Sequence, residues 1–256
     1  SQLLPKKIEA FAESVVAVSA GSDFGAYSQL GHGDAQNKPL PTKVEALAGQ
    51  RVLAVSARGT HNIALTADGS VWSWGGGAFG KLGHGEQAQL LPKKVEAFAG
   101  RRVVAVSAGS LHSLALTADG AVWSWGHGAS FGEWGQLGHG DEQHQLLPKK
   151  VEALADQRVV AVSYGARHSL AITADGAVWS WGDGSLGQLG HGNNQNLRQA
   201  QLLPKKVEAL AGQRVVAVSA WEHSLALTAN GALWSWGYGA LGQLGHGDQQ
   251  NQLLPK

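Results

Sequence analysis

The sequence predicts an all-β protein built from repeated sheets, and three observations carry this prediction. First, the phrase Leu-Leu-Pro-Lys-Lys-Val-Glu-Ala recurs with small changes, and its prolines are 36, 51, 56, 56 and 51 residues apart. Second, each full copy contains short β-branched runs separated by a strong turn signal. Third, no part of the chain has helical periodicity over a useful length. A period near fifty residues is typical of architectures in which like units stack on one another.

One copy shows the three strands expected of each unit. Residues 101–108 are a β-branched run with apolar residues on both faces, which favours a strand covered on both sides. Residues 112–117 follow as a second strand, and Asp119-Gly120 predicts a two-residue hairpin because both turn positions favour positive φ. Residues 121–126 return as the third strand. Its two tryptophans are two residues apart, so they project from one face.

A fourth, outer strand is expected from residues 148–154, which belong to the next copy of the repeat phrase. The proline of that phrase would lie at the sheet edge, where a missing N–H costs little. Each copy is then a three- or four-stranded antiparallel sheet that is apolar on both faces. Because such a sheet is unstable alone, like sheets must cover it on either side. Radial stacking into a β-propeller satisfies every copy equally.

The repeated residues also resemble a known family. The string Val-Ser-Ala-Gly-x-x-His-Ser-Leu-Ala-Leu-Thr-Ala-Asp-Gly-Ala-Val-Trp-Ser-Trp-Gly, followed by Gly-Gln-Leu-Gly-His-Gly, is similar to the repeat of the regulator of chromosome condensation (RCC1) family. The resemblance covers residues 39–256 closely and residues 1–38 partly. It implies a β-propeller, most often of seven blades, that serves as a binding scaffold. Family members include a Ran nucleotide-exchange factor, a plant ultraviolet-B photoreceptor, domains of large ubiquitin ligases and a bacterial β-lactamase inhibitor.

We therefore predict a single RCC1-like repeat domain over residues 1–256, either a whole β-propeller or a propeller segment. The expected repeats, four of them full and the first truncated, are 1–38, 39–89, 90–145, 146–201 and 202–256. The first copy is about 16 residues shorter than the family unit and lacks the second strand, the Asp-Gly turn and the third strand. We interpret this as a segment absent from the sequence, because losing two central strands would expose an apolar sheet edge. A degenerate blade is the alternative.

Composition excludes several classes of protein. Twenty basic and nineteen acidic residues give a net charge of +1, so nucleic acid and anionic membrane exert no general attraction. The absence of cysteine excludes disulfides, thiol catalysis and cysteine-ligated zinc. Apolar runs are far too short to span a membrane, and no signal-peptide pattern is visible. An intracellular location is favoured, with the compartment unknown. Because the chain lacks an initiator methionine and starts within the repeat phrase, we expect a piece of a longer protein.

Histidine is abundant, and most histidines occupy two repeated positions. The first position holds His61, His112, His168 and His223, and the second holds His32, His84, His139, His191 and His246. A metal ion needs converging ligands, whereas propeller symmetry spreads equivalent residues around a circle. We therefore predict that these imidazoles bond to strand ends and to Gly-His-Gly turns. Only His127 and His144 lie outside the pattern, and two histidines are too few to claim a site.

The remaining motifs are interpreted as structural. Asp68, Asp119 and Asp175 could suggest calcium, but the fourth copy has Asn230, so the position is expected to shape a turn. The Lys-Lys pairs are each followed by a glutamate and guard outer strands, so nucleic-acid binding is not expected. The glycine strings lack the following helix of a phosphate loop. Since no catalytic constellation rises above the repeat pattern, we predict no enzyme activity and no cofactor or metal.

Function is expected where the copies differ, because residues present in every copy are needed for folding. Variable residues lie ahead of the strand histidine, as in Arg58-Gly59-Thr60, and after the Trp-Ser-Trp strand. Large apolar, aromatic and arginine side chains on such loops are enriched at protein interfaces. The predicted partner-binding residues are Phe131, Glu133, Trp134, Tyr164, Arg167, Arg198 and Trp221.

Three functional hypotheses follow. The first is a non-catalytic protein-interaction scaffold, for example a peripheral subunit of a larger assembly, that binds its partner through variable loops. The second, which the family resemblance alone implies, is guanine-nucleotide exchange on a small GTPase. The third is ultraviolet sensing. The photoreceptor signature resembles Gly-Trp-Arg-His-Thr, and here only Trp221 falls on its tryptophan position and Arg167 on its arginine.

Overall fold

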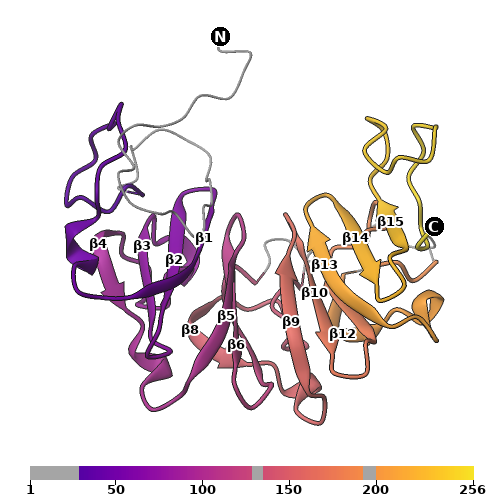
Figure 1. The fold of residues 1–256 in the computed structure, drawn as a ribbon, viewed down its shortest axis with the longest axis horizontal. Coiled ribbons are helices and arrows are strands. Elements are labelled where there is room, and N and C mark those ends of the chain that lie inside the picture. The colour runs from indigo at the N-terminus through magenta and orange to yellow at the C-terminus, as the bar shows by residue number, and fades with distance from the viewer. Residues whose placement is uncertain (1–28, 129–134, 193–199) are drawn as a thin grey trace.

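The computed structural model describes residues 29–128, 135–192 and 200–256, which form an arc of four antiparallel sheets, or blades (Figure 1). Within each blade the strands follow one another in spatial order. Blade 1 comprises β1 (Val52–Arg58), β2 (His61–Thr66), β3 (Val71–Gly75) and β4 (Gln89–Lys94). Blade 2 comprises β5 (Val103–Ala108), β6 (His112–Thr117), β7 (Val122–Gly126) and β8 (Gln145–Lys150). Blade 3 comprises β9 (Val159–Tyr164), β10 (His168–Thr173), β11 (Val178–Gly182) and β12 (Gln201–Lys206). Blade 4 comprises β13 (Val215–Ala220), β14 (His223–Thr228) and β15 (Leu233–Gly237). The predicted all-β propeller architecture is confirmed.

Short 3-10 helices complete the blades. One, η3 (Ala78–Gly80), follows β3. The others share the Glu-Ala-Leu or Glu-Ala-Phe part of the repeat phrase, and each precedes the first strand of a blade: η2 (Glu45–Leu47), η4 (Glu96–Phe98), η5 (Glu152–Leu154) and η6 (Glu208–Leu210). The first strands of successive blades, β1, β5, β9 and β13, contact one another and form the inner side of the arc.

The predicted outer strand is confirmed. Strand β8 contains Pro148 and pairs with β7, and the pairing is irregular between Ser124 and Gly126. The proline therefore falls where the ladder is already interrupted, so its missing N–H removes little. Blades 1 and 3 repeat this irregular pairing at the same position. In blade 4 the chain end takes this place, through a bridge between Gly237 and Gln252.

Blades are offset from the sequence repeats. The sheet of blade 1 extends to Lys94, although the repeat phrase that ends it starts the next predicted repeat at residue 90. Each phrase thus supplies the outer strand of one blade and then the 3-10 helix that leads into the next. The chain therefore runs from the outer strand of one blade, through the 3-10 helix, to the inner strand of the next blade.

In blades 2 to 4, both tryptophans of the Trp-Ser-Trp strand pack towards the preceding blade. In blade 2, Phe98 contacts Trp123 and Trp125 edge to face, with ring centroids 5.7 and 5.6 Å apart respectively. Trp125 is fully buried in a cluster that joins blade 1 residues such as Ile63 and Val71 to the phrase residue Val95. The predicted projection of both rings from one face is thus confirmed in blade 2, and this packing forms the core between blades.

A backbone carbonyl at each blade boundary accepts two hydrogen bonds from the following blade. The Gln136 carbonyl accepts from Trp181 Nε1 at 2.9 Å and from Ser169 Oγ at 2.9 Å. We call this arrangement the blade stitch. It recurs at three further carbonyls with their donors: Gln29 with Trp74 and Asn62, Lys81 with Trp125 and Ser113, and Gln188 with Trp236 and Ser224.

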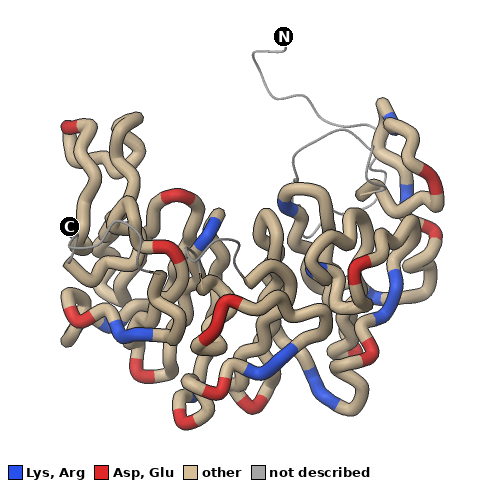
Figure 2. The backbone as a smooth tube through the Cα atoms, turned by 180° about the vertical axis from the view of Figure 1, so that it is seen from behind, with Lys and Arg blue, Asp and Glu red and all other residues tan. Residues whose placement is uncertain are grey.

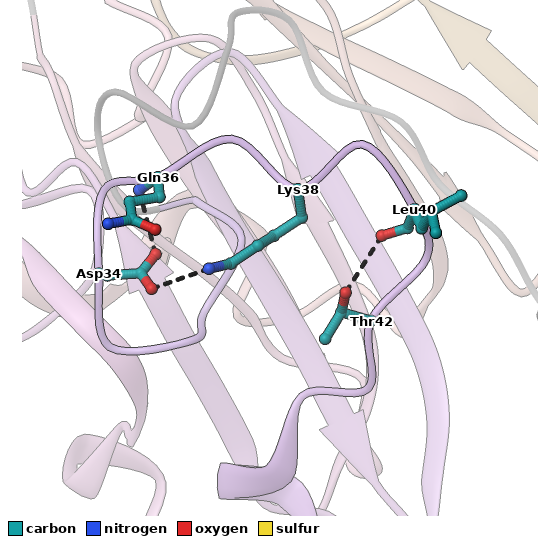
Figure 3. A network of polar contacts seen from close by, with 5 residues as sticks. All are labelled: Asp34, Gln36, Lys38, Leu40 and Thr42. Carbon is teal, nitrogen blue, oxygen red and sulfur yellow. Dashed lines mark hydrogen bonds and ion pairs between the residues drawn. The ribbon is translucent and has the colours of Figure 1, made fainter.

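The segment that leads from the truncated first repeat into the second is held by local polar contacts (Figure 3). Asp34 accepts a hydrogen bond from the Gln36 N–H at 3.0 Å and pairs with Lys38 Nζ at 2.9 Å. Thr42 Oγ1 donates to the Leu40 carbonyl at 3.1 Å. Residues 1–28 lie outside the described part of the chain, so the interpretation of the shortened copy stays a prediction.

The stitch gives a matched pair of tryptophan substitutions in blade 3. Trp181→Phe removes the indole donor to the buried Gln136 carbonyl, which should lower the free energy of unfolding by about 0.5–1.5 kcal/mol, since Ser169 still donates to this carbonyl. Trp179→Phe removes a buried indole N–H that has no hydrogen-bond partner, so it should cost less. Urea unfolding of both variants checks this order. Equal losses, or a larger loss for Trp179→Phe, would contradict the importance of the stitch.

Candidate functional site

Loops that differ between repeats gather at one end of the propeller arc. In blade 1 the end of β3 pairs with the start of β2, through Gly75 and His61, so the β1–β2 loop and the β3–β4 connection emerge together. A backbone hydrogen bond of 2.8 Å from the Gly76 N–H to the Thr60 carbonyl joins them. Blades 2, 3 and 4 repeat this bond, with lengths of 3.0, 3.0 and 3.3 Å. We call this the variable end.

The opposite end carries the nearly identical hairpins between the second and third strands of each blade. In each hairpin the side-chain oxygen of the predicted turn residue accepts from a threonine hydroxyl, as for Asp68 with Thr66 and for Asn230 with Thr228, both at 2.6 Å. Asn230 makes the same bonds as the aspartates without a charge. The turn interpretation of these acids is therefore confirmed.

Arg58 connects three blades at the variable end. It lies at the end of β1, and its Nη1 donates to the Tyr164 carbonyl at 2.8 Å and the Ala220 carbonyl at 3.3 Å. Its guanidinium also stacks over the Trp221 ring, 4.0 Å from the ring centroid. Partial burial lowers the pKa of Arg58, but a guanidinium stays charged at any physiological pH. Blade 1 is thereby tied to blades 3 and 4 across the inner side of the arc.

Two predicted contact residues lie side by side at this end. Trp221, in the β13–β14 loop, is 40% exposed although Arg58 covers part of its ring. Arg167, in the β9–β10 loop, is also exposed. The Ala166 N–H donates to the Trp221 carbonyl at 2.9 Å, which holds the two loops together. The result is an exposed aromatic ring stacked under Arg58, with the loop that carries Arg167 held beside its backbone.

Tyr164 occupies a different environment from Arg167 and Trp221. It is only 2% exposed and packs in the core between blades 2 and 3. Its ring lies against His112 and over Gly109, where a Cβ atom would collide with it. The side chain stands where other blades have Ala57, Ala108 and Ala220, and it fills the space that Gly109 leaves. We therefore leave Tyr164 out of the proposed contact surface.

The other predicted contact residues, Phe131, Glu133, Trp134 and Arg198, lie outside the described residues, and their role stays a prediction. Arg58 was named among the variable residues but not among the predicted contacts. Its signal in the sequence is a charged residue where the second and third repeats have Gly109 and Gly165.

The repeated histidines have structural partners. In blade 2, Ser124 Oγ donates to the Leu137 carbonyl, so the His139 Nε2–H must donate to Ser124 Oγ, at 2.9 Å. Equivalent serine–histidine contacts in the other blades involve His84, His191 and His246. At the first position, His61 and His168 contact Ser113 and Ser224 of the next blade, at 2.9 and 2.8 Å. The predicted hydrogen-bonding role is confirmed for these six residues.

The two histidines outside the repeat pattern meet in blade 2. The rings of His127 and His144 stack with centroids 4.7 Å apart, and Phe79 of blade 1 contacts both edges. His144 Nδ1 accepts from the Gly128 N–H at 3.1 Å. Burial and the nearby His144 lower the pKa of His127 to about 4. Among residues 29–128, 135–192 and 200–256, no three histidine or acidic side chains form a group that could hold a metal ion.

Basic and acidic residues are interspersed over the described backbone (Figure 2). Lys150 lies 3.4 Å from Glu152, and Lys149 lies 4.0 Å from Asp141. Both lysines of the outer strand β8 thus lie near acids.

Repeated blades joined by the blade stitch, with variable loops at one end, define a β-propeller repeat domain. The family model for the RCC1-like domain matches residues 16–256, and the chain belongs to this family.

Curated relatives are much longer than the part that this chain matches. The chain is 39% identical over 234 residues to the ultraviolet-B receptor UVR8 of Arabidopsis thaliana. The aligned region covers 90% of this chain and 51% of UVR8. It is 37% identical over 265 residues to the human E3 ubiquitin-protein ligase HERC2, covering 99% of this chain and 5% of the relative. The chain thus spans about half of one relative and a small part of the other.

Solved structures give the same fold. Prp20p of Saccharomyces cerevisiae, a protein described for its binding to Gsp1p and histones, superposes with a TM-score of 0.76 at 27% identity. The match covers 91% of this chain and 57% of Prp20p. Human WBSCR16 superposes with a TM-score of 0.72 at 26% identity, covering 91% and 60% of the two chains. In the described part of this chain, no helix combines the length and apolar character needed to cross a membrane.

The buried histidines predict acid instability. Burial lowers the pKa of His61 and of His168 to about 3, whereas both titrate near 6.5 when unfolded. Between these values the unfolded chain binds more protons, so stability is present above pH 6.5 and falls as pH decreases. Each of the two histidines should remove about 1.4 kcal/mol per pH unit in this range. Urea midpoints at pH 7.5, 6.0 and 5.0 measure the slope.

A His168→Gln variant is the control for this measurement. It should be less stable at neutral pH, because the bond to Ser224 is lost, but its stability should depend less steeply on pH. A wild-type midpoint that is constant between pH 7.5 and 5.0 would contradict the assignment of neutral, buried imidazoles.

Proposed function

We propose that this RCC1-like domain is a non-catalytic protein-interaction module that binds its partner through the variable end, for example as a peripheral subunit of a larger assembly. The observation that carries the proposal is the exposed Trp221 ring, which is stacked under Arg58 and lies in a loop hydrogen-bonded to the loop of Arg167. Tryptophan and arginine are the residues most enriched at interface hot spots.

The geometry favours binding without a large ordering cost. The Trp221 ring is stacked under a guanidinium whose own hydrogen bonds reach blades 3 and 4, so its orientation is fixed before a partner arrives. Preordered side chains lose less entropy on association, which improves affinity for a given contact area. The rigid blades support variable loops, and this is the usual arrangement of binding loops on a scaffold.

A second candidate is regulation of a small GTPase by nucleotide exchange. The similarity to Prp20p, at 27% identity over 91% of this chain, supports it. The chain covers only 57% of Prp20p, so a large part of that protein's surface has no counterpart in the match. A nucleotide-release assay with a small GTPase tests this candidate, and no acceleration would dismiss it.

Ultraviolet sensing is the least favoured candidate. It is supported by 39% identity to the Arabidopsis receptor and by the stacking of Arg58 on Trp221. The chain spans 51% of that receptor, and only Trp221 falls on the tryptophan of the resembled signature. A change of oligomeric state under ultraviolet-B light would revive it.

Site-specific photo-cross-linking tests the proposed binding end. A photoreactive amino acid replacing Arg167 should capture a stoichiometric protein partner in native extract at moderate salt. The same probe replacing Arg214, an exposed arginine beside the hairpin end of blade 3, should capture much less of it. Capture that is equal at both positions, or that occurs only at position 214, would contradict binding through the variable end.

Substitution of the central side chains tests the energetics. Trp221→Ala should weaken partner binding by about 2 kcal/mol or more, as expected for a hot-spot residue. Because Trp221 is 40% exposed, its removal should leave the thermal transition cooperative. Arg214→Ala is the matched control and should bind as the wild type does. Unchanged binding by Trp221→Ala, measured on the cross-linked partner after its identification, would exclude this ring from the interface.

A further inference from the structure

The two histidines outside the repeat pattern lie where blades 1 and 2 meet at the variable end. His127 directly follows β7 and is only 2% exposed, whereas His144 directly precedes β8 and is half-buried. Phe79, in the β3–β4 connection of blade 1, contacts the rings of His127 and His144 at centroid distances of 4.5 and 5.0 Å. We call Phe79, His127 and His144 the histidine cluster.

Hydrogen bonds show where the protons of these two imidazoles lie. The Gly128 N–H donates to His144 Nδ1 at 3.1 Å, and a backbone N–H can only donate. Gln136 Nε2 donates to the His127 carbonyl at 2.9 Å and lies 3.3 Å from His127 Nδ1, where the amide again supplies the proton. Both rings are therefore neutral in this arrangement, with their protons on Nε2.

A proton added to either ring breaks the arrangement. An imidazolium carries N–H groups on both nitrogens, so a protonated His144 has no lone pair left for the Gly128 N–H. The two rings stack with centroids 4.7 Å apart, so charge on one disfavours charge on the other. Burial and the neighbouring His144 lower the pKa of His127 to about 4, which agrees with a neutral ring in this contact.

The groups around the cluster do not compensate a positive charge. On the blade 1 side, Lys81 is a buried base that donates to a threonine hydroxyl. On β6, burial and nearby histidines hold the pKa of His112 well below 6.5. On the connection of His144 itself, Asp141 pairs with a lysine of β8, and among the described residues neither Glu142 nor any other carboxylate pairs with His144. A protonated His144 therefore gains no counter-charge from this part of the chain.

Phe79 adds backbone strain that opening would relieve. Within the described ranges it is the one residue other than glycine with a positive φ, at 61°. Side chains disfavour this conformation, which persists only where the surroundings impose it. Here the phenyl ring is held against the edges of two imidazoles. Separation of the cluster would allow Phe79 to return to a negative φ.

We propose that the histidine cluster is a pH-sensitive latch, which holds the β3–β4 and β7–β8 connections together near neutral pH and releases them when His144 is protonated. The latch is closed where both rings are neutral, and it opens as the pH falls. It is a property of the chain alone and does not depend on a partner. Control of partner binding by the latch rests on the proposed function, so the experiments below use the chain without a partner.

Blade 4 contains the same backbone contact without a titratable group. The Gly239 N–H, equivalent to that of Gly128, donates to Asn251 Oδ1 at 2.9 Å. An asparagine amide accepts this bond as an imidazole nitrogen does, but it takes up no proton in this pH range. The chain therefore carries its own pH-insensitive control.

Amide hydrogen exchange of the purified wild-type chain tests the latch. After correction for intrinsic exchange rates, protection of the Gly128 N–H should fall by about five- to tenfold between pH 7.5 and 5.0, because its acceptor is lost. Protection of the Gly239 N–H should change much less. Constant protection at Gly128, or an equal loss at both amides, would overturn the proposal.

A His144→Asn variant gives blade 2 the acceptor of blade 4. Its Gly128 protection should be nearly independent of pH, since asparagine does not titrate. His191→Asn is the matched control: it changes a repeated histidine of blade 3 and should keep the wild-type pH response at Gly128. Thermal melting shows that each variant is folded. A full pH response in His144→Asn, or its loss in His191→Asn, would contradict the assignment of the latch to His144.

Discussion

The blade stitch is the interaction on which the rest of this structure depends. A sheet that is apolar on both faces needs a neighbouring sheet on each side. Packing two sheets together removes backbone carbonyls at their boundary from water, so these carbonyls need hydrogen-bond donors within the protein. At Gln136 both requirements are met by residues of one neighbour, Trp181 and Ser169. The Trp181 ring buries apolar area between the blades, and its N–H donates a hydrogen bond to the carbonyl at the same boundary. This explains why the Trp-Ser-Trp strand and the Gly-Gln-Leu-Gly-His-Gly motif recur together.

Because the stitch and the hairpins use repeated residues, differences between copies collect at the variable end. Arg58, one of these variable residues, connects blade 1 with blades 3 and 4 and holds Trp221 in a fixed orientation.

Much of the fold could be predicted from the sequence, because strands, the Asp119-Gly120 turn and the outer strand with Pro148 follow from local patterns that recur. Contacts between residues distant in sequence could not. Arg58 is 106 residues from Tyr164, and no local pattern indicates their bond. Tyr164 was predicted as a contact residue because it is large and variable, but Gly109 of another blade leaves the space that buries it. The contact between His127 and His144 likewise depends on how the β7–β8 connection folds back.

A double-mutant cycle in blade 3 tests the stitch most directly, with Trp181→Phe and Ser169→Ala combined and urea unfolding as the measurement. Each single variant leaves one donor on the buried Gln136 carbonyl, and the double variant leaves none. The account predicts that the double variant loses about 1 kcal/mol more than the sum of the single losses, because the carbonyl becomes unsatisfied. Losses that merely add, or a double variant more stable than that sum, would contradict the claim that this carbonyl joins the blades.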